Sequence, residues 1–335
     1  MNILLTGGAG FMGSNMVHYL LRQYPEYKVL NFDKLTYAGN PANVKNIEKN
    51  PNYTFMQGDI ADEEGVNKAF EEFKPDVVIN YAAETHVDRS ILDPKAFLMT
   101  DIIGTYTLLE AMRKYGTKKM VQISTDEVFG SIEEGAFTET SPFEPNSPYS
   151  ASKAGGDHLC RAYWVTFETP VVVTHSCNFY GPNQYPEKLI PLFITNLIEG
   201  KKVPVYAKGE NVREWIFTED HCRAVDRILH DGKPGDVYNI GTGKELTNME
   251  ITNMILKALG VGEEMIEYVK DRPGHDFRYA IDCSKLTNDL GWKPSVEFEE
   301  GLQQTIDWYK NNEDWWKPLK SGEYMEYYKK QYQDR

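Results

Sequence analysis

The chain has 335 residues, of which 41% are hydrophobic and 26% are charged. This is the composition of an ordinary globular protein, long enough for one large domain and a smaller one. The formal net charge of −14 disfavours nucleic acid or an anionic membrane as a general partner, because phosphate-rich surfaces bind basic proteins. A small phosphorylated ligand is still allowed, since it needs only a few local donors.

Export and metal binding are not indicated by the sequence. No apolar run approaches the ~20 residues of a membrane-spanning helix. The first predicted strand begins at Asn2 and leaves no room for a signal peptide, so we expect a cytoplasmic protein. The four cysteines are far apart and lack metal-ligand spacing, so we expect reduced, mostly buried thiols and no metal site at Cys160, Cys177, Cys222 and Cys283.

A glycine-rich turn follows the first predicted strand, residues 2–6, and precedes a helical pattern. Gly7 permits a tight turn, Gly10 permits a pyrophosphate to approach the backbone N–H groups, and Gly13 permits close packing of helix on strand. The alternative is a plain glycine-rich turn without a ligand. The order strand, glycine loop, helix favours a dinucleotide-binding unit.

An acidic residue supports the same interpretation. Asp33 ends the second predicted strand, residues 28–32, and lies twenty residues beyond Gly13. An acidic residue near this position accepts hydrogen bonds from the ribose hydroxyls of NAD. Its charge would repel the 2′-phosphate of NADP, so the sequence predicts NAD as the cofactor.

Tyr149 and Lys153 are four residues apart and therefore lie on one face of a predicted helix. The ammonium of Lys153 can then lie beneath the phenol and favour its ionised form, which would make Tyr149 a base. By itself the pattern is common and usually marks a solvated surface pair. Together with the G-x-x-G-x-x-G spacing of Gly7, Gly10 and Gly13, it resembles the extended short-chain dehydrogenase/reductase family.

The resemblance covers the whole chain and implies an α/β fold. We expect a Rossmann-type doubly wound parallel sheet with a smaller C-terminal α/β domain that binds the substrate. Residues 1–178 would form the NAD-binding domain and residues 179–335 the nucleotide-sugar-binding domain. Segments around 211–241 are expected to return to the first domain, so the boundary is interleaved.

The resemblance also implies a cofactor site and an assembly. The helices predicted over residues 101–114 and 151–167 would form a two-fold interface, so a homodimer is expected. NAD would be held by the glycine loop, by the ends of the following strands and by the helix of the tyrosine–lysine pair, at Gly7, Gly10, Phe11, Met12, Gly13, Asp33, Lys34, Leu35, Thr36, Asp59, Ile60, Tyr81, Ala82, Ala83, Thr100, Tyr149, Lys153 and Phe179.

Four longer motifs narrow the resemblance. Residues 82–90, 125–127, 178–191 and 271–282 closely resemble nucleotide-sugar 4,6-dehydratases, with dTDP-glucose as the implied substrate. Two positions depart from the family pattern, because Ser is more usual than Thr85, and Tyr is more usual than Phe129. The first departure keeps the hydroxyl, and the second removes a phenol without an expected change in the reaction.

The implied chemistry couples oxidation to elimination and assigns catalytic roles to Thr125, Asp126, Glu127, Tyr149 and Lys153. As a phenolate stabilised by Lys153 and by the positive nicotinamide, Tyr149 would remove the C4 hydroxyl proton while Thr125 holds the same oxygen. Glu127 would remove the C5 proton, and a protonated Asp126 would donate to the departing C6 hydroxyl. The pKa of Asp126 must then be raised, and the adjacent carboxylate acts in that direction. For an arbitrary acidic pair, an exposed loop would be the simpler interpretation.

The substrate needs donors for its diphosphate and a pocket for its base. Lys188, Arg213, Asn248 and Arg272 are suitable donors, although a surface ion pair with Glu214 is an alternative for Arg213. A role as direct ligand or as loop residue stays open for His86 and Arg89. The complete predicted set is Thr85, Thr125, Asn178, Lys188, Leu189, Pro204, Tyr206, Arg213, Asn248, Arg272 and His275.

Two other functions fit parts of the sequence. A nucleotide-sugar 4-epimerase of the same fold needs Tyr149 and the cofactor, but it needs no acid and base for C5 and C6. A non-catalytic NAD-binding sensor has no use for Tyr149 with Lys153. The pair Asp126 and Glu127 is the feature that favours a dehydratase.

Overall fold

The computed structural model of the chain describes residues 1–271 and 274–332. A seven-stranded sheet forms its centre, with the strand order β10-β6-β5-β4-β1-β2-β3, and every neighbouring pair is parallel. The strands are β1 (Asn2–Thr6), β2 (Lys28–Asp33), β3 (Tyr53–Gln57), β4 (Val77–Asn80), β5 (Lys119–Thr125), β6 (Val171–Ser176) and β10 (Val237–Ile240).

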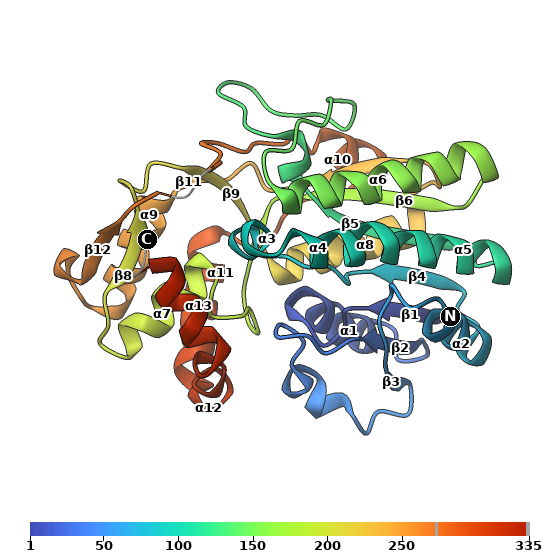
Figure 1. Cartoon of the computed structure of the whole chain (residues 1–335), viewed down its shortest axis with the longest axis horizontal. Coiled ribbons are helices and arrows are strands. Elements are labelled where there is room, and N and C mark those ends of the chain that lie inside the picture. Colours follow the sequence, from blue (N-terminus) through green and yellow to red (C-terminus); the bar gives the residue numbers. More distant parts are fainter. Residues whose placement is uncertain (272–273, 333–335) are drawn as a thin grey trace.

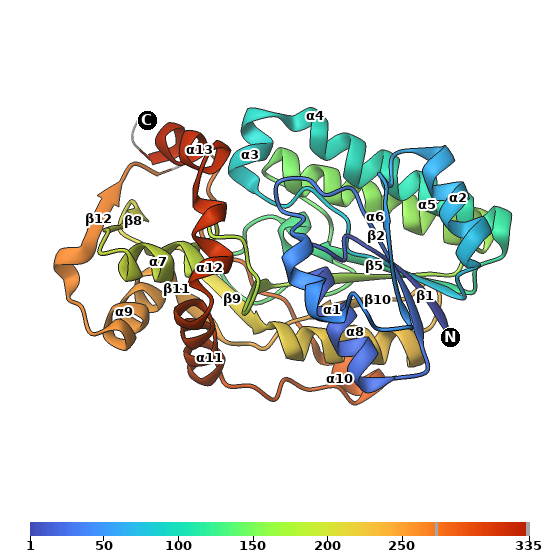
Figure 2. The ribbon, with the colours of Figure 1, turned by 90° about the horizontal axis from the view of Figure 1, so that it is seen from below.

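Helices cover both faces of this sheet (Figure 2), which explains why its central strands are apolar along their length. Side chains alternate between the faces, so Leu4 packs in one buried cluster while Ile3 and Leu5 pack in another. One face is covered by α2 (Glu63–Phe73), α5 (Thr105–Tyr115) and α6 (Pro148–Phe167), and the other by α1 (Phe11–Gln23), α8 (Thr218–Asp231) and α10 (Ser284–Leu290).

The helical segment that precedes α5 is irregular. After α3 (Val87–Leu92) and α4 (Pro94–Phe97), the chain forms a π-helical stretch, η2 (Leu98–Gly104). Gly156 of α6 lies directly against this stretch, because a Cβ atom there would be 2.8 Å from the carbonyl oxygen of Asp101. The close approach brings the backbone of η2 next to the first turns of α6.

The second part of the chain lies to the left in Figure 1 and has its own buried cluster, which includes Ile190, Phe193, Trp215 and Tyr309. It contains two small sheets, with the orders β11-β9-β7 and β12-β8. The elements of this part are β7 (Asn178–Tyr180), α7 (Leu189–Ile198), β8 (Val203–Tyr206), β9 (Val212–Phe217), β11 (Glu245–Thr247), α9 (Asn248–Leu259), β12 (Ile266–Val269), α11 (Phe298–Asn311), α12 (Glu313–Trp316) and α13 (Glu323–Tyr332).

Short 3-10 turns complete the structure: η1 (Pro41–Ile47), η3 (Asp126–Phe129), η4 (Glu263–Met265) and η5 (Pro318–Lys320). The chain crosses between its two parts more than once, since α8 and β10 lie with the large sheet whereas β9 and β11 lie in a small one. Within the described ranges, no helix is both long and apolar enough to cross a membrane. The predicted Rossmann-type parallel sheet is confirmed.

Candidate active site

A cavity lies at the carboxyl edge of the large sheet, where ligands bind in open α/β folds. Because all seven strands are parallel, their ends meet at this edge. Gly7, Asp33, Tyr81 and Asp126 each follow or end one of these strands, and all four line the cavity. The beginning of α7, at Leu189, lines it from the second part of the chain.

The glycine loop after β1 has a geometry that only glycine allows. Gly7 has a φ of 69°, in the left-handed region. A Cβ atom on Gly13 would lie 2.1 Å from the carbonyl oxygen of Gly7, so a side chain there cannot fit. No side chain among the described residues caps the start of α1, which leaves its first N–H groups available for an anion.

Asp33 fixes the position of this loop. One carboxylate oxygen accepts a hydrogen bond from the N–H of Ala9 at 2.8 Å, and the other accepts one from the N–H of Leu35 at 2.8 Å. Each oxygen keeps lone-pair capacity for a ribose hydroxyl. The residues present therefore fit a dinucleotide, with its diphosphate at α1 and its ribose at Asp33.

The structure brings together nearly all of the residues predicted to hold the cofactor. Leu35 is the exception, because it adopts a left-handed turn with a φ of 59° and contributes its N–H group to Asp33 rather than to the cavity wall. The predicted residues that line the cavity are Gly7, Gly10, Phe11, Met12, Gly13, Asp33, Lys34, Thr36, Asp59, Ile60, Tyr81, Ala82, Ala83, Thr100, Tyr149, Lys153 and Phe179.

All five predicted catalytic residues also line this cavity. Thr125 ends β5, and its hydroxyl caps the turn η3 by accepting a hydrogen bond from the N–H of Glu127 at 3.3 Å. Tyr149 and Lys153 lie in the first turns of α6. That helix begins at Pro148 behind a capping box between Ser147 and Ser150, so local sequence fixes where the tyrosine enters the site.

Asp126 is buried, with 2% of its surface exposed. Burial raises the pKa of its carboxyl well above the ordinary value of 3.8, and the nearby Glu127 and Glu214 raise it further. Arg213 acts in the opposite direction with a smaller effect. A protonated Asp126 can donate a proton, as the predicted acid must, whereas the half-buried Glu127 beside it is reached from the same cavity.

The Tyr149 phenol has a raised pKa in the protein without its cofactor. Burial raises the pKa of its phenol well above 10.0, and the carboxyls of Glu127 and Asp101 raise it further, while a hydrogen bond with Thr125 lowers it. The ammonium of Lys153 donates to the carbonyl oxygen of Ile123 at 2.7 Å. Without the cofactor, burial and carboxyls therefore favour the neutral phenol. The expected phenolate relied on the positive nicotinamide as well as on Lys153, and a positive charge brought into the cavity would favour it.

Asp101 is a buried carboxyl group that the sequence did not single out. It lies on η2, is 3% exposed, and accepts a hydrogen bond from the Ser152 hydroxyl at 2.6 Å. Burial raises its pKa to about 7, Lys153 lowers it, and Glu84 raises it. The available sequence signal was an acidic residue in a helix expected to cover the sheet, but only the packing of η2 on α6 brings it close to Lys153.

Five of the predicted substrate residues also line the cavity: Thr85, Thr125, Asn178, Lys188 and Leu189. The Lys188 ammonium donates to the carbonyl oxygen of Thr85 at 2.7 Å, which joins two loops across the cavity. Arg89 is not among the described residues that line the cavity. It forms an ion pair of 2.9 Å with the buried Glu187, which does line it.

The other predicted substrate residues form a separate group around β8 and β9. Among the described residues, Pro204, Tyr206, Arg213, Asn248 and His275 do not line the cavity. The rings of Tyr206 and His275 are 5.8 Å apart. Arg272 lies outside the described residues.

Arg213 does not form the surface ion pair considered as an alternative. It is buried, and its guanidinium donates to the carbonyl oxygens of Val212, Asp276 and Phe277. Glu214 instead accepts hydrogen bonds from the N–H groups of Thr242 and Gly243. The two side chains of this sequence pair point to different partners because they alternate along β9.

Fold and site together define a dinucleotide-dependent enzyme of the extended short-chain dehydrogenase/reductase class. The family model described as GDP-mannose 4,6 dehydratase matches residues 4–305. A dTDP-glucose 4,6-dehydratase from Streptomyces antibioticus is 50% identical, and the alignment covers 96% of each chain.

Two solved structures are also similar. A dTDP-glucose 4,6-dehydratase from Bacillus anthracis, in complex with NAD, has a TM-score of 0.90 and 52% identity over 95% of this chain and 99% of its own. The corresponding enzyme DesIV from Streptomyces venezuelae, with NAD bound, has a TM-score of 0.93 and 47% identity over 95% and 100%. The chain belongs to the family of dTDP-glucose 4,6-dehydratases. The predicted family and enzyme class are confirmed.

The raised pKa of Asp101 predicts how stability depends on pH. The folded chain binds this proton more tightly than the unfolded chain, so the free energy of unfolding falls as the pH rises from the ordinary value of 3.8 towards about 7. Asp101→Asn does not titrate. We therefore expect the variant to gain stability relative to the parent as the pH is raised from about 5 to 8, measured from urea unfolding midpoints.

The matched control is Asp282→Asn, because the Asp282 carboxyl is also partly buried but has a lowered pKa, owing to hydrogen bonds from Ser284. It is ionised in both states over this range, so its stability difference from the parent should stay constant. A constant difference for Asp101→Asn would contradict the prediction.

Proposed function

We propose that the chain removes water across C5 and C6 of dTDP-glucose and gives dTDP-4-keto-6-deoxy-glucose, with NAD as its cofactor. The observation that carries the proposal is that one cavity contains the dinucleotide loop, Tyr149, and the pair of Asp126 and Glu127. Relatives named dTDP-glucose 4,6-dehydratase, two of them solved with NAD, support the same substrate and cofactor.

When bound, NAD accepts a hydride from C4 and later returns a hydride to C6, so the reaction needs no external reductant. Side chains of the protein transfer the proton of the first step. Tyr149 must be a phenolate to accept the proton of the C4 hydroxyl, and the positive charge of bound NAD would favour that form. Thr125 holds the same oxygen by a hydrogen bond. Lys153 contributes positive charge to the same cavity, and its position is fixed by the Ile123 carbonyl oxygen.

The elimination step uses the two adjacent carboxyl groups. A carbonyl group at C4 acidifies the C5–H bond, and Glu127 takes that proton. Asp126 gives its proton to the C6 hydroxyl, the C6–O bond breaks, and water leaves. The buried environment that raises the pKa of Asp126 keeps its carboxyl protonated until the elimination step. A proton is delivered to C5 when the hydride returns to C6.

Incubating the purified protein with dTDP-glucose in deuterated water, without added cofactor, tests this function. We expect a 4-keto-6-deoxy sugar with one deuterium at C5, because Glu127 exchanges its proton with solvent before the reverse transfer. Mass spectrometry and NMR identify the product. A C4 epimer without deuterium would indicate an epimerase, and bound NAD without turnover would indicate a sensor.

The roles of the two carboxyl groups are tested by Asp126→Asn and Glu127→Gln. Each variant should lose roughly 10²- to 10⁴-fold in the rate of dehydration, the range expected for one general acid or base. Absorbance of reduced nicotinamide in a single turnover should still report the first hydride transfer. Glu134→Gln, in a nearby exposed loop, is the control and should match the parent. Parent rates in both site variants would refute the assigned roles.

We also propose that the enzyme is a homodimer. Large apolar side chains are exposed along η2 and α5, including Met99, Ile103 and Tyr106 at 40–44%. Val165 and Phe167 on α6 are exposed as well. Monomeric proteins rarely leave such a group uncovered, and the two helices are those for which family resemblance implies a two-fold interface.

Ile103→Glu should weaken this dimer, because the contact would bury an unpaired charge. We expect the mass in solution to fall from that of two chains towards that of one, measured by light scattering on a size-exclusion column. Phe55→Glu is the control, since Phe55 is equally exposed at 41% but lies on β3. A parent protein with the mass of one chain would exclude the dimer.

The proposed location is the cytoplasm. All four cysteines are unpaired, and three of them are buried. This state suits a compartment that keeps thiols reduced.

A further inference from the structure

The last described segment, residues 313–332, contains α12, η5 and α13 and is called the C-terminal clasp below. It lies on the side of the second part that faces the large sheet (Figure 2). At its beginning, the indole N–H of Trp315 donates to the side-chain oxygen of Asn43 at 2.8 Å. The amide of Asn43 in turn donates to the carbonyl oxygen of Ala9 in the glycine loop at 2.9 Å.

The middle of the clasp supports the wall of the cavity from behind. The hydroxyl of Tyr324 donates to the carbonyl oxygen of Pro186 at 3.2 Å. The hydroxyl of Tyr185 donates to the carbonyl oxygen of Leu319 at 3.5 Å. The neighbouring Glu187 and Lys188 line the cavity together with Tyr185. The clasp thus contacts the backbone that presents these side chains.

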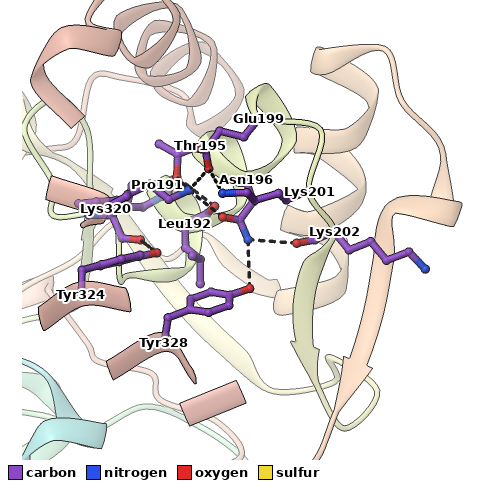
Figure 3. A network of polar contacts seen from close by, with 11 residues as sticks. Pro191, Leu192, Thr195, Asn196, Glu199, Lys201, Lys202, Lys320, Tyr324 and Tyr328 are labelled. Carbon is purple, nitrogen blue, oxygen red and sulfur yellow. Dashed lines mark hydrogen bonds and ion pairs between the residues drawn. The ribbon is translucent and has the colours of Figure 1, made fainter. Parts of the chain in front are cut away.

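Lys320 attaches the clasp to α7 (Figure 3). Its ammonium donates to the Thr195 hydroxyl at 3.2 Å, to the Asn196 side-chain oxygen at 2.8 Å and to the Glu199 carboxylate at 2.7 Å. Only 5% of the lysine side chain is exposed. A buried ammonium is tolerated only with such partners, so the three acceptors fix where the clasp lies.

The helix that receives Lys320 begins at Leu189, directly after Lys188. The N–H of Leu192 donates to the carbonyl oxygen of Lys188 at 2.8 Å, and the N–H of Lys188 donates to the carbonyl oxygen of Tyr185 at 3.3 Å. The wall segment is therefore held from two sides, by the first turn of α7 and by the clasp. Lys320 joins these two supports.

We propose that Lys320 is a positioning residue for the nucleotide-sugar side of the cavity, because it locks the C-terminal clasp on α7 and thereby holds residues 185–188 in place. Lys320 does not line the cavity, so it acts through this segment. The inference rests on the proposed function and on the prediction from sequence that Lys188 binds the substrate.

Lys320→Met keeps most of the length of the side chain and removes the three hydrogen bonds. We expect the KM for dTDP-glucose to rise roughly tenfold, in line with the loss of bonds to a charged group, with a kcat within about threefold of the parent. The amount of NAD retained on purification should not change, since the contact of Trp315 with Asn43 remains. Lys320→Arg, which restores the charge, should recover part of the affinity.

Lys201→Met is the matched control. Lys201 also contacts the Glu199 carboxylate, at 3.0 Å, but it is 57% exposed and does not belong to the clasp. It should behave as the parent does. Tyr324→Phe removes the contact with Pro186 and should raise the KM by a smaller factor. The double variant with Lys320→Met should add little, because both changes act on one path.

Hydrogen exchange separates this inference from the proposed function, because it needs no substrate. The amides of Lys188 and Leu192 should exchange faster in Lys320→Met than in the parent and in Lys201→Met. Unchanged exchange together with an unchanged KM would overturn the inference. Equal losses of NAD retention, kcat and substrate affinity would also overturn it, since they would indicate general destabilisation.

Discussion

A carboxyl group kept out of water beside a second carboxyl group is the constraint on which the rest of this structure depends. Asp126 and Glu127 follow β5 directly, and burial raises the pKa of the first. Asp126 could not act as an acid on an exposed loop, where it would be ionised. The covered edge of a parallel sheet supplies the required burial, and β5 places the pair beside the tyrosine of α6.

Close backbone contacts support the same site from the other side. The glycine loop has no room for a side chain at Gly13, and Asp33 holds the loop through the N–H of Ala9. Gly156 lets η2 approach α6 and brings Asp101 into the surroundings of Lys153. The cofactor side and the acid–base side are thus built from tight packing of main chain on main chain.

The sequence was informative wherever function depends on residues that are neighbours in the chain. The strands, the glycine spacing, the end of β2 at Asp33 and the catalytic pair are local patterns, and the structure places them as expected. The expected ionisation of Tyr149 rested on Lys153 and on the positive nicotinamide, and the sequence could not show which other groups act on its pKa. Burial and two carboxyls from other elements decide that pKa.

By itself, then, the sequence determined the class of fold, the cofactor loop and the residues proposed as acid and base, since each follows from spacing along one strand, turn or helix. Only the tertiary structure decided that Asp101 faces α6, that Arg213 binds backbone carbonyls, and that Lys320 is buried on α7. These facts depend on how distant segments pack, and on which groups that packing removes from water. No local pattern carries that information.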